Sequence, residues 1–304
     1  MTQAEQITQQ PESNEGASEH ITLFAEPIHQ YGPPAGGFTI TNSLLTSWLA
    51  VAVIIVLALI LRSKLKTIPG KIQNVFEMIL EGALDMCDQV TNDRALSIRI
   101  FPIAISVFFF ILVNNWLGLV PLGGFGIIEK SKDGLSFIPF LRGGTADINT
   151  TLALAVMAVI GANVFGVVSI GLWKTFNKYV NLNVLGGIFT KIRNEPTIII
   201  VAPITFFVGL IEIVGEFAKV ASLSFRLFGN VFAGEVLLAS MAALVAYIIP
   251  IPFLFLELLV GVIQALIFSI LLVVYFTIAA SDHEEEHETG EEKKLVKELV
   301  KEMG

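Results

Sequence analysis

The sequence predicts an all-α, polytopic integral membrane protein with about five membrane passages and one further helix at the membrane surface. The first observation is that only 15% of its 304 residues are charged, whereas a soluble domain usually carries about 25%. The second is a mean hydropathy of +0.74. The third is that several apolar stretches reach the roughly 20 residues that a helix needs to cross the hydrocarbon.

The N-terminal half supplies two of the predicted spans. Residues 1–42 form a polar, acidic tail without the basic and apolar regions of a signal peptide. The first span covers about residues 43–61 and is followed by basic residues. Apolar positions at helical spacing over 65–97 predict a helix at the membrane surface or packed on a neighbour. The second span covers about residues 98–119.

The C-terminal half begins with a Gly-rich loop, followed by a third span at about 148–173. An apolar stretch over 197–249 would reach about 75 Å as a helix, although the hydrocarbon is only about 30 Å thick. This stretch is therefore either two spans or one strongly tilted passage. After two prolines, the last span covers about 253–280. The membrane domain thus occupies 43–281, and 282–304 form a charged tail.

Basic residues are distributed unequally between the two sides of the membrane. With five passages, the 62–99 loop, the 174–193 loop and the C-terminal tail share one side and carry fourteen Lys and Arg residues, against three on the other side. Cytoplasmic loops are enriched in Lys and Arg, so we expect the N-terminus outside and the C-terminus in the cytoplasm. The asymmetry also favours one tilted passage, because an extra crossing would move the basic C-terminal residues outside.

Several other classes of site are not expected. The sequence has no basic stripe, so a nucleic-acid partner is not expected. A single cysteine, Cys87, excludes an internal disulfide framework. Residues 283–287 fit the HExxH zinc pattern, but they lie in a run of glutamates that we interpret as a solvated tail. No GxxxxGK[ST] phosphate loop is present. We therefore expect no metal, cofactor or nucleotide site in this chain.

Charged and amide side chains interrupt the last two apolar segments. A charge at mid-bilayer costs from about 2.5 to well over 10 kcal/mol, depending on the method. The residues concerned are Glu212, Glu216, Lys219, Arg226, Asn230, Glu235, Glu257 and Gln264. Ionisable residues inside a membrane usually mark ion or proton paths.

Helical spacing places these residues in two polar zones. Glu212, Lys219 and Arg226 are seven residues apart and share one helix face. Glu235 lies half a turn out of phase with Arg226 and about 13 Å further along the axis. Because the prolines turn the chain back before the last helix, Glu235 and Glu257 can converge.

An arginine between two polar zones interrupts a proton path. Arg226 cannot deprotonate at any reachable pH, and it can pair with a carboxylate that another subunit brings to it. An access path, an exit path and a barrier between them suit a proton-driven rotor. The alternative is that Glu212, Glu216 and Lys219 form static ion pairs, for example between Glu212 and Lys219.

Four motifs resemble those of the ATP synthase a subunit family, in the same order along the chain. Residues 224–235 read SFRLFGNVFAGE and are very similar to the family signature. The other three are NWLGLVP at 115–121, TADINTTLALA at 145–155 and QALIF at 264–268. The likeness covers roughly residues 40–281.

This resemblance implies roles for individual residues. Arg226 corresponds to the essential arginine that faces the ring of c subunits, and Asn230 to the signature asparagine near it. The polar residues of the half-channel open to the outer face are Glu235, Glu257 and Gln264. Possible positions of the cytoplasmic half-channel are Glu212, Ser222 and Lys219.

The resemblance further implies a non-catalytic stator subunit of an F-type ATP synthase in a bacterial plasma (inner) membrane. Two offset half-channels would pass protons to and from the rotating c ring, coupled to ATP synthesis, and the last two helices would form a hairpin against that ring. Its partners would be the c ring, the b subunits of the peripheral stalk and the rest of the complex. One alternative is a secondary transporter or channel acting alone. Another is a structural subunit in which Lys or Gln can replace Arg226.

Overall fold

Most of the apolar part of the chain is described by the computed structural model, which covers residues 27–31, 38–65, 70–119, 126–131, 134–139, 142–172, 198–244 and 248–281. The basic loop at 174–193 and the acidic tail at 282–304, with its HExxH pattern, lie outside the described residues. Within them, five helices are long and apolar enough to cross a membrane. This confirms the predicted all-α polytopic fold with five passages.

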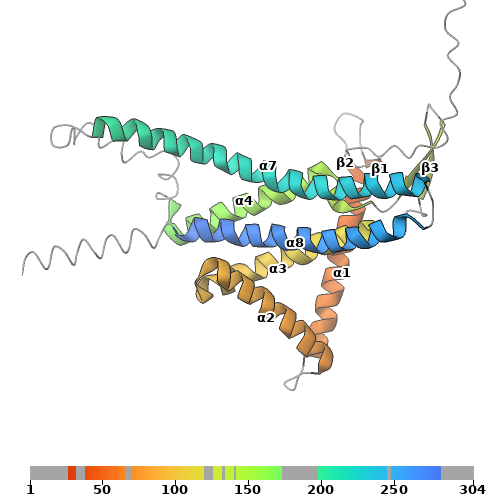
Figure 1. The fold of residues 1–304 in the computed structure, drawn as a ribbon, viewed down its shortest axis with the longest axis horizontal. Helices are drawn as coiled ribbons and strands as arrows, with labels where there is room; N and C mark the ends of the chain where they lie inside the picture. The colour runs from red at the N-terminus through yellow and green to blue at the C-terminus, as the bar shows by residue number, and fades with distance from the viewer. Residues whose placement is uncertain are drawn as a thin grey trace, which may run out of the picture.

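The first two helices form two sides of a triangle beside the later helices (Figure 1). Helix α1 (Asn42–Lys64) runs steeply across the direction of the later helices, and α2 (Lys71–Thr91) returns diagonally from its far end. Helix α2 is capped at its C-terminus by Asn92, whose φ of 53° is the left-handed conformation common at helix C-termini. Its apolar side packs on the next helix, where Phe76 stacks on Phe109 with ring centroids 6.3 Å apart. The helix predicted within 65–97 is therefore present and packs on a neighbour.

The second and third predicted spans are α3 (Arg94–Leu119) and α4 (Ile148–Ile170). Asp147 starts α4 by accepting the backbone N–H of Asn149 at 3.1 Å, which satisfies one of the unpaired amides of the first turn. Gly171 ends the helix with a φ of 98°, a conformation that residues with a side chain rarely adopt.

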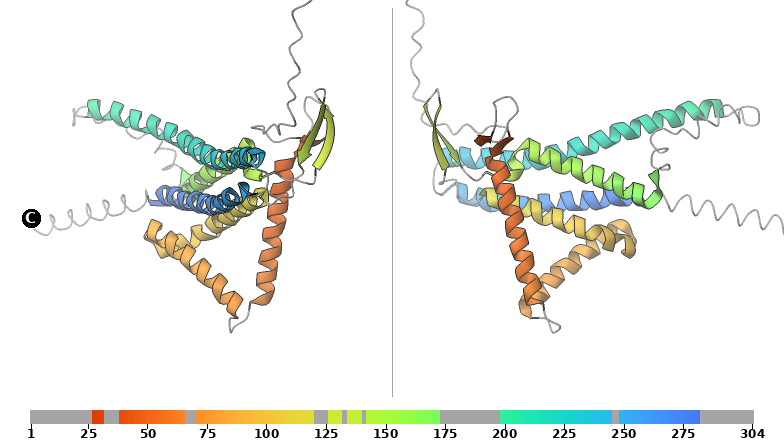
Figure 2. Two further views of the ribbon diagram at one scale, coloured as in Figure 1. Left: turned by 45° about the vertical axis from the view of Figure 1, so that its right-hand side comes forward. Right: turned by 180° about the vertical axis from the view of Figure 1, so that it is seen from behind.

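The last two helices are the longest and form an antiparallel hairpin (Figures 1 and 2). Helix α7 (Ile198–Leu244) is continuous over 47 residues, so it extends for about 70 Å. A bilayer about 30 Å thick can hold such a helix only if it is strongly tilted. The apolar stretch is thus one passage and not two. Helix α8 (Pro250–Ser281) begins at a proline, which the first turn tolerates because its N–H is not needed there.

Two short antiparallel strand pairs, which were not predicted, lie in segments that the sequence analysis described as a tail and a loop. In the expected N-terminal tail, β1 (Pro27–Tyr31) pairs with β2 (Phe38–Thr41), and in the expected Gly-rich loop, β3 (Gly126–Ser131) pairs with β4 (Gly134–Pro139). β-Branched and aromatic residues favour strands over loops. In the second pair they oppose one another, as Ile127 with Ile138 and Ile128 with Phe137.

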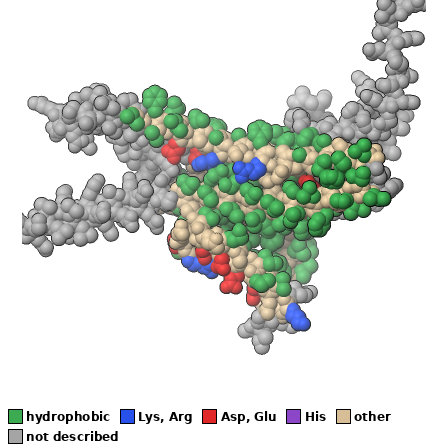
Figure 3. All heavy atoms as spheres, in the orientation of Figure 1, with side chains coloured by type: hydrophobic (Ala, Val, Ile, Leu, Met, Phe, Trp, Pro, Cys, Tyr) green, Lys and Arg blue, Asp and Glu red, His purple; other side chains and the backbone are tan. Residues whose placement is uncertain are grey.

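Helix α8 lies at the centre of the bundle and contacts α2, α3, α4 and α7. Its fully or nearly fully buried apolar side chains are Ala265, Phe268, Leu272, Val273 and Phe276. Leu223 and Leu227 of α7 and Ile100 and Ile111 of α3 complete this core. Hydrophobic side chains also cover much of the outer surface (Figure 3), as expected where lipid takes the place of water.

Candidate functional site

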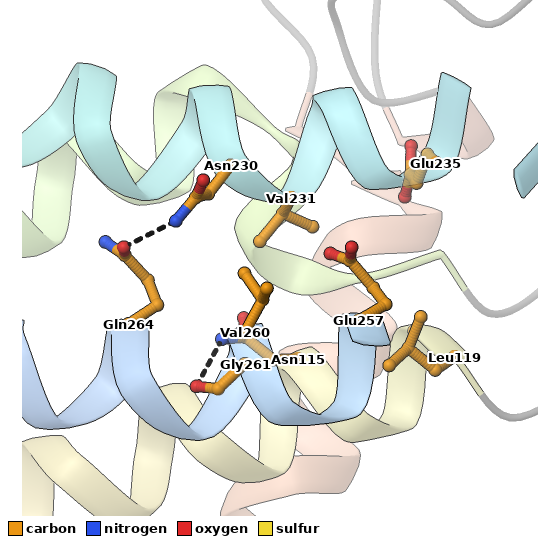
Figure 4. Close-up of a pocket in the computed structure, with 10 residues that line it drawn as sticks. Asn115, Leu119, Asn230, Val231, Glu235, Glu257, Val260, Gly261 and Gln264 are labelled. Atoms are coloured by element: carbon orange, nitrogen blue, oxygen red, sulfur yellow. Dashed lines mark hydrogen bonds between the residues drawn. The ribbon is translucent and has the colours of Figure 1, made fainter. Parts of the chain in front are cut away.

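A pocket lined in part by polar side chains lies between α3, α7 and α8, close to the end where the last two helices meet (Figure 4). It is lined by four of the residues singled out from the sequence: Asn230, Glu235, Glu257 and Gln264. Asn115 of α3 lines the same pocket. The structure therefore brings together the side chains expected to form the outer half-channel.

Two glutamates reach this pocket from facing helices. Glu235 lies near the C-terminal end of α7, and Glu257 extends from the first part of α8 toward α7 (Figure 4). The carboxylate of Glu257 lies against Gly234, where an added Cβ would overlap both carboxylate oxygens. The predicted convergence of Glu235 and Glu257 is confirmed, and the glycine before Glu235 makes room for it.

An arginine that sequence reasoning did not select holds one of these glutamates. Arg142, just before the motif that opens α4, donates through Nε at 3.2 Å and through a terminal nitrogen at 3.1 Å to Oε2 of Glu235. Only 10% of the Arg142 side chain and 24% of the Glu235 side chain are exposed. In the sequence, Arg142 counted only as one of three basic residues on the outer side, and no local pattern links it to a partner 93 residues away.

Amide side chains connect α7, α8 and α3 around the pocket. Asn230 donates to Oε1 of Gln264 at 2.7 Å, and Gln264 is only 2% exposed. Asn115 donates to the backbone oxygen of Gly261 at 3.3 Å and accepts the hydroxyl hydrogen of Thr145 at 2.7 Å. Because buried polar groups are costly without partners, these bonds fix the register of the three helices around the pocket. Asn115 and Thr145 belong to two of the quoted motifs, but their pairing was not anticipated.

Arg226 lies outside this pocket, on the exposed face of α7. Its guanidinium donates to the Ser222 hydroxyl at 3.4 Å, one turn earlier on the same helix. Among the described residues, no carboxylate lies within ion-pair distance of it. Its neighbours Leu223 and Leu227 are buried in the core, which turns Arg226 outward. Figure 3 shows basic side chains on the visible face of α7.

A second polar cluster lies further toward the N-terminal end of α7. Lys219 pairs with Glu216 at 2.7 Å, and Asn163 of α4 donates to the other oxygen of Glu216 at 3.2 Å. The Lys219 ammonium also lies 5.4 Å from the centre of the Tyr275 ring. A static ion pair of the kind anticipated from the sequence therefore exists, but Lys219 pairs with Glu216 and not with Glu212, the example given there. Glu212 lies about one turn further along the same helix and is half-buried.

Arg226 thus divides α7 between two polar clusters. Lys219 precedes it by seven residues and Glu235 follows it by nine, which correspond to about 10 Å and 13 Å along the axis. Neither cluster is continuous with the arginine through side-chain hydrogen bonds among the described residues. This arrangement offers two separate polar regions with a fixed positive charge between them.

Comparison with known proteins identifies the family. A model of the family described as ATP synthase A chain matches residues 44–277. ATP synthase subunit a of Geotalea daltonii is 31% identical over 255 residues, covering 84% of this chain and 93% of that protein. The chloroplastic ATP synthase subunit a of Stigeoclonium helveticum is 33% identical over 257 residues, covering 84% and 91%. The match extends over all five predicted spans, and the chain belongs to the ATP synthase A chain family.

Proposed function

We propose that this chain is the stator subunit that passes protons between two offset half-channels and a rotating ring of c subunits, coupled to ATP synthesis. The observation that carries the proposal is the exposed Arg226 between two polar clusters on one long membrane helix. The family supports membership in the ATP synthase. The half-channels and the contact with the ring are our inference from the geometry.

The exposure of Arg226 calls for a partner outside this chain. An unpaired arginine facing lipid costs several kcal/mol or more, and among the described residues no carboxylate compensates it. A carboxylate on a neighbouring subunit removes this cost through a charge-assisted hydrogen bond. A ring that presents one carboxylate after another fits this requirement, and α7 offers it a long apolar face that includes the exposed Phe217 and Phe225.

The pocket near the α7–α8 turn is our candidate for the outer half-channel. Its carboxylates, Glu235 and Glu257, can exchange protons with water, and its amides, Asn230 and Gln264, can hydrate the path toward Arg226. A proton that arrives here neutralises a carboxylate of the ring. The neutral ring site can then rotate into lipid at low cost, since it no longer carries a charge.

The cluster on the other side of Arg226 is our candidate for the cytoplasmic half-channel. It holds Lys219 and Glu212, together with Glu216 and Asn163. We assign Ser222 to the same half-channel, although it lies between the cluster and Arg226 and accepts a hydrogen bond from the arginine. A ring site that arrives from lipid loses its proton here, and Arg226 stabilises the emptied carboxylate. Each charge that crosses gains about 2.3 kcal/mol per 100 mV of membrane potential, so several protons are needed for each ATP.

The same proposal includes the setting of the chain. We place it in a bacterial plasma (inner) membrane, in line with its bacterial relative. The unequal distribution of Lys and Arg favours the N-terminus outside and the C-terminus in the cytoplasm. Its partners are the c ring, the b subunits of the peripheral stalk and the remaining ATP synthase subunits. The chain itself is non-catalytic in this scheme. The alternative of a transporter acting alone predicts ion transport by the isolated chain in liposomes.

The test is Arg226→Ala in inverted membrane vesicles that contain the whole complex. ATP-driven proton uptake is measured first, and passive proton leak is measured after the catalytic head is stripped off. We expect uptake to be lost while leak is kept or raised, because Arg226 both meets the ring and separates the half-channels. The matched control is Arg99→Ala, at an exposed arginine of α3, with uptake unchanged.

Normal ATP-driven uptake in the Arg226→Ala complex would contradict the proposal. Subunit content of the membranes separates a transport defect from failed assembly. If the alanine variant does not assemble, Arg226→Lys keeps the charge but not the planar fork of donors. Full uptake in that variant would favour a structural subunit with static ion pairs.

A further inference from the structure

We propose that Arg142 is a positioning residue of the pocket, which holds Glu235 as a permanent ion pair and leaves Glu257 as the carboxyl group that exchanges protons there. This inference rests on the proposed role of the pocket as the outer half-channel. It assigns different tasks to two glutamates that the sequence presents as equivalent.

The contact between Arg142 and Glu235 is built to be permanent. Two guanidinium nitrogens donate to Oε2 of Glu235, at 3.1 and 3.2 Å, and both side chains are largely buried. Arginine stays protonated at every accessible pH. Removing one partner of a buried ion pair leaves an uncompensated charge, which is strongly destabilising. Glu235 is therefore held as a carboxylate while the pair lasts.

The loop that carries Arg142 is clamped against the helices. A Cβ added at Gly118 of α3 would lie 2.7 Å from the Cα of Gly143, so the two backbones are already in close contact. A Cβ at Gly143 would lie 3.7 Å from Oε1 of Glu235. The loop continues directly into the short helix η2 (Gly144–Ala146), where Ala146 donates its N–H to the Gly143 oxygen at 2.9 Å. The packing of the loop backbone thus fixes the position of Arg142 beside Glu235.

Glu257 lies in the same pocket under different constraints. Within the described part of the chain, its carboxylate makes no hydrogen bond or ion pair, and it lies against the backbone at Gly234. Its side chain is half-buried and lines the pocket. A carboxyl group without a fixed partner can take up and release a proton without breaking a salt bridge.

The ion pair also weakens the mutual repulsion of the two carboxylates. Like charges that share a site make one carboxyl group retain its proton more strongly. Among the described residues that line the pocket, the charged group that shares it with Glu257 is Glu235 of α7, the partner of Arg142, while α3 contributes the neutral Asn115. With Arg142 in place, Glu257 lies next to an ion pair of Arg142 and Glu235 that has no net charge. Glu257 can therefore release its proton to the ring.

The experiment uses the whole ATP synthase in proteoliposomes, oriented so that the outer side of the protein is exposed to the lumen. ATP synthesis is measured against lumenal pH, with the total driving force held constant through a potassium diffusion potential. In Arg142→Gln, the lumenal pH for half-maximal synthesis should rise by about 1 unit, because the unpaired Glu235 strengthens proton retention. In Glu235→Gln, the unpaired Arg142 should lower it. In the double variant Arg142→Gln/Glu235→Gln, it should return to the wild-type position.

The opposite signs and their cancellation distinguish a charge effect from a structural tether. If Arg142 only anchored the loop, its loss would lower the synthesis rate at every pH, and Glu235→Gln would not restore it. That result, or an unchanged pH profile in both single variants, overturns the inference. Arg142→Lys keeps the positive charge, so the shift in the pH profile should be smaller than in Arg142→Gln. The matched control Arg99→Gln should leave the profile unchanged.

Failure of this inference can be told apart from failure of the proposed function. If Glu257→Gln and Arg226→Ala abolish synthesis while Arg142→Gln leaves the pH profile unchanged, only the division of tasks between the glutamates is wrong. If Glu257→Gln keeps wild-type synthesis, Glu257 is not the exchanging group. If Arg226→Ala also keeps it, the proposed function fails as well.

Discussion

The substitution Gly234→Ala tests whether the position of the Glu257 carboxylate controls proton transfer. A Cβ at residue 234 would overlap both carboxylate oxygens of Glu257, so this group has to move by about 1 Å or more to restore ordinary van der Waals contact. The displaced atoms are the far end of a flexible side chain, and alanine favours a helix over glycine by about 1 kcal/mol. We therefore expect normal folding with a misplaced carboxylate.

A misplacement of about 1 Å in a reacting group can cost about 100-fold in rate. We expect ATP-driven proton uptake in inverted vesicles to fall by about 10- to 100-fold, with a normal content of the subunit in the membrane. The matched control is Gly82→Ala on α2, where an added Cβ meets nothing within 4 Å, and uptake should be unchanged.

Adding Glu257→Asp to Gly234→Ala should restore part of the uptake, because the shorter side chain withdraws the carboxylate from the new methyl group. Wild-type uptake in Gly234→Ala alone would refute the reasoning. It would mean that the carboxylate works equally well from another position, or that Glu257 takes no part in transfer.

Further substitutions at Thr145, Gly118 and Asp88 test packing by thermal unfolding of the purified complex, the first two near the site and the third at the end of α2. Thr145→Val removes the 2.7 Å hydrogen bond to Asn115 and should cost about 1–3 kcal/mol, whereas Thr145→Ser, which keeps the hydroxyl, should cost less. Gly118→Ala forces a methyl group against the backbone of Gly143, which cannot rotate away, so it should cost about 1–3 kcal/mol and reduce assembly. On α3, the Ser97 hydroxyl and the Arg94 guanidinium hold the pKa of Asp88 below its usual value of 3.8. The ionised Asp88 carboxylate therefore stabilises the folded state fully above pH 3.8. Below that pH the difference in unfolding temperature between the wild type and Asp88→Asn should narrow.

The membrane helices could be predicted from the sequence because length and hydropathy alone decide whether a segment spans. The continuity of α7 followed from the distribution of basic residues, which a second crossing would have disturbed. The strand pairs β1–β2 and β3–β4 were missed, because four to six residues between glycines and prolines carry little periodic signal. Each pair also forms within a segment whose local pattern is typical of a loop.

The candidate site was predicted in part. Glu235, Glu257 and Gln264 stood out because charged and amide side chains are rare in apolar helices, and the proline turn predicted that Glu235 and Glu257 converge. Arg142 gave no such signal, since a basic residue in a polar loop is ordinary. Its role depends on the tertiary contact between the loop and α7, which no local spacing reveals. The same holds for Asn163, which reaches Glu216 from α4.

The spacing of charges along α7 favours a moving carrier over a fixed chain of proton donors. Lys219 and Glu235 are separated by sixteen residues, or about 24 Å of helix, whereas direct transfer between side chains requires a hydrogen bond of about 3 Å. Arg226 lies between them and cannot release its proton, so it cannot pass one along. A carboxylate that visits each cluster in turn closes this gap by its own displacement. Such a carrier can meet the arginine only if the arginine faces outward, and this is where α7 holds it.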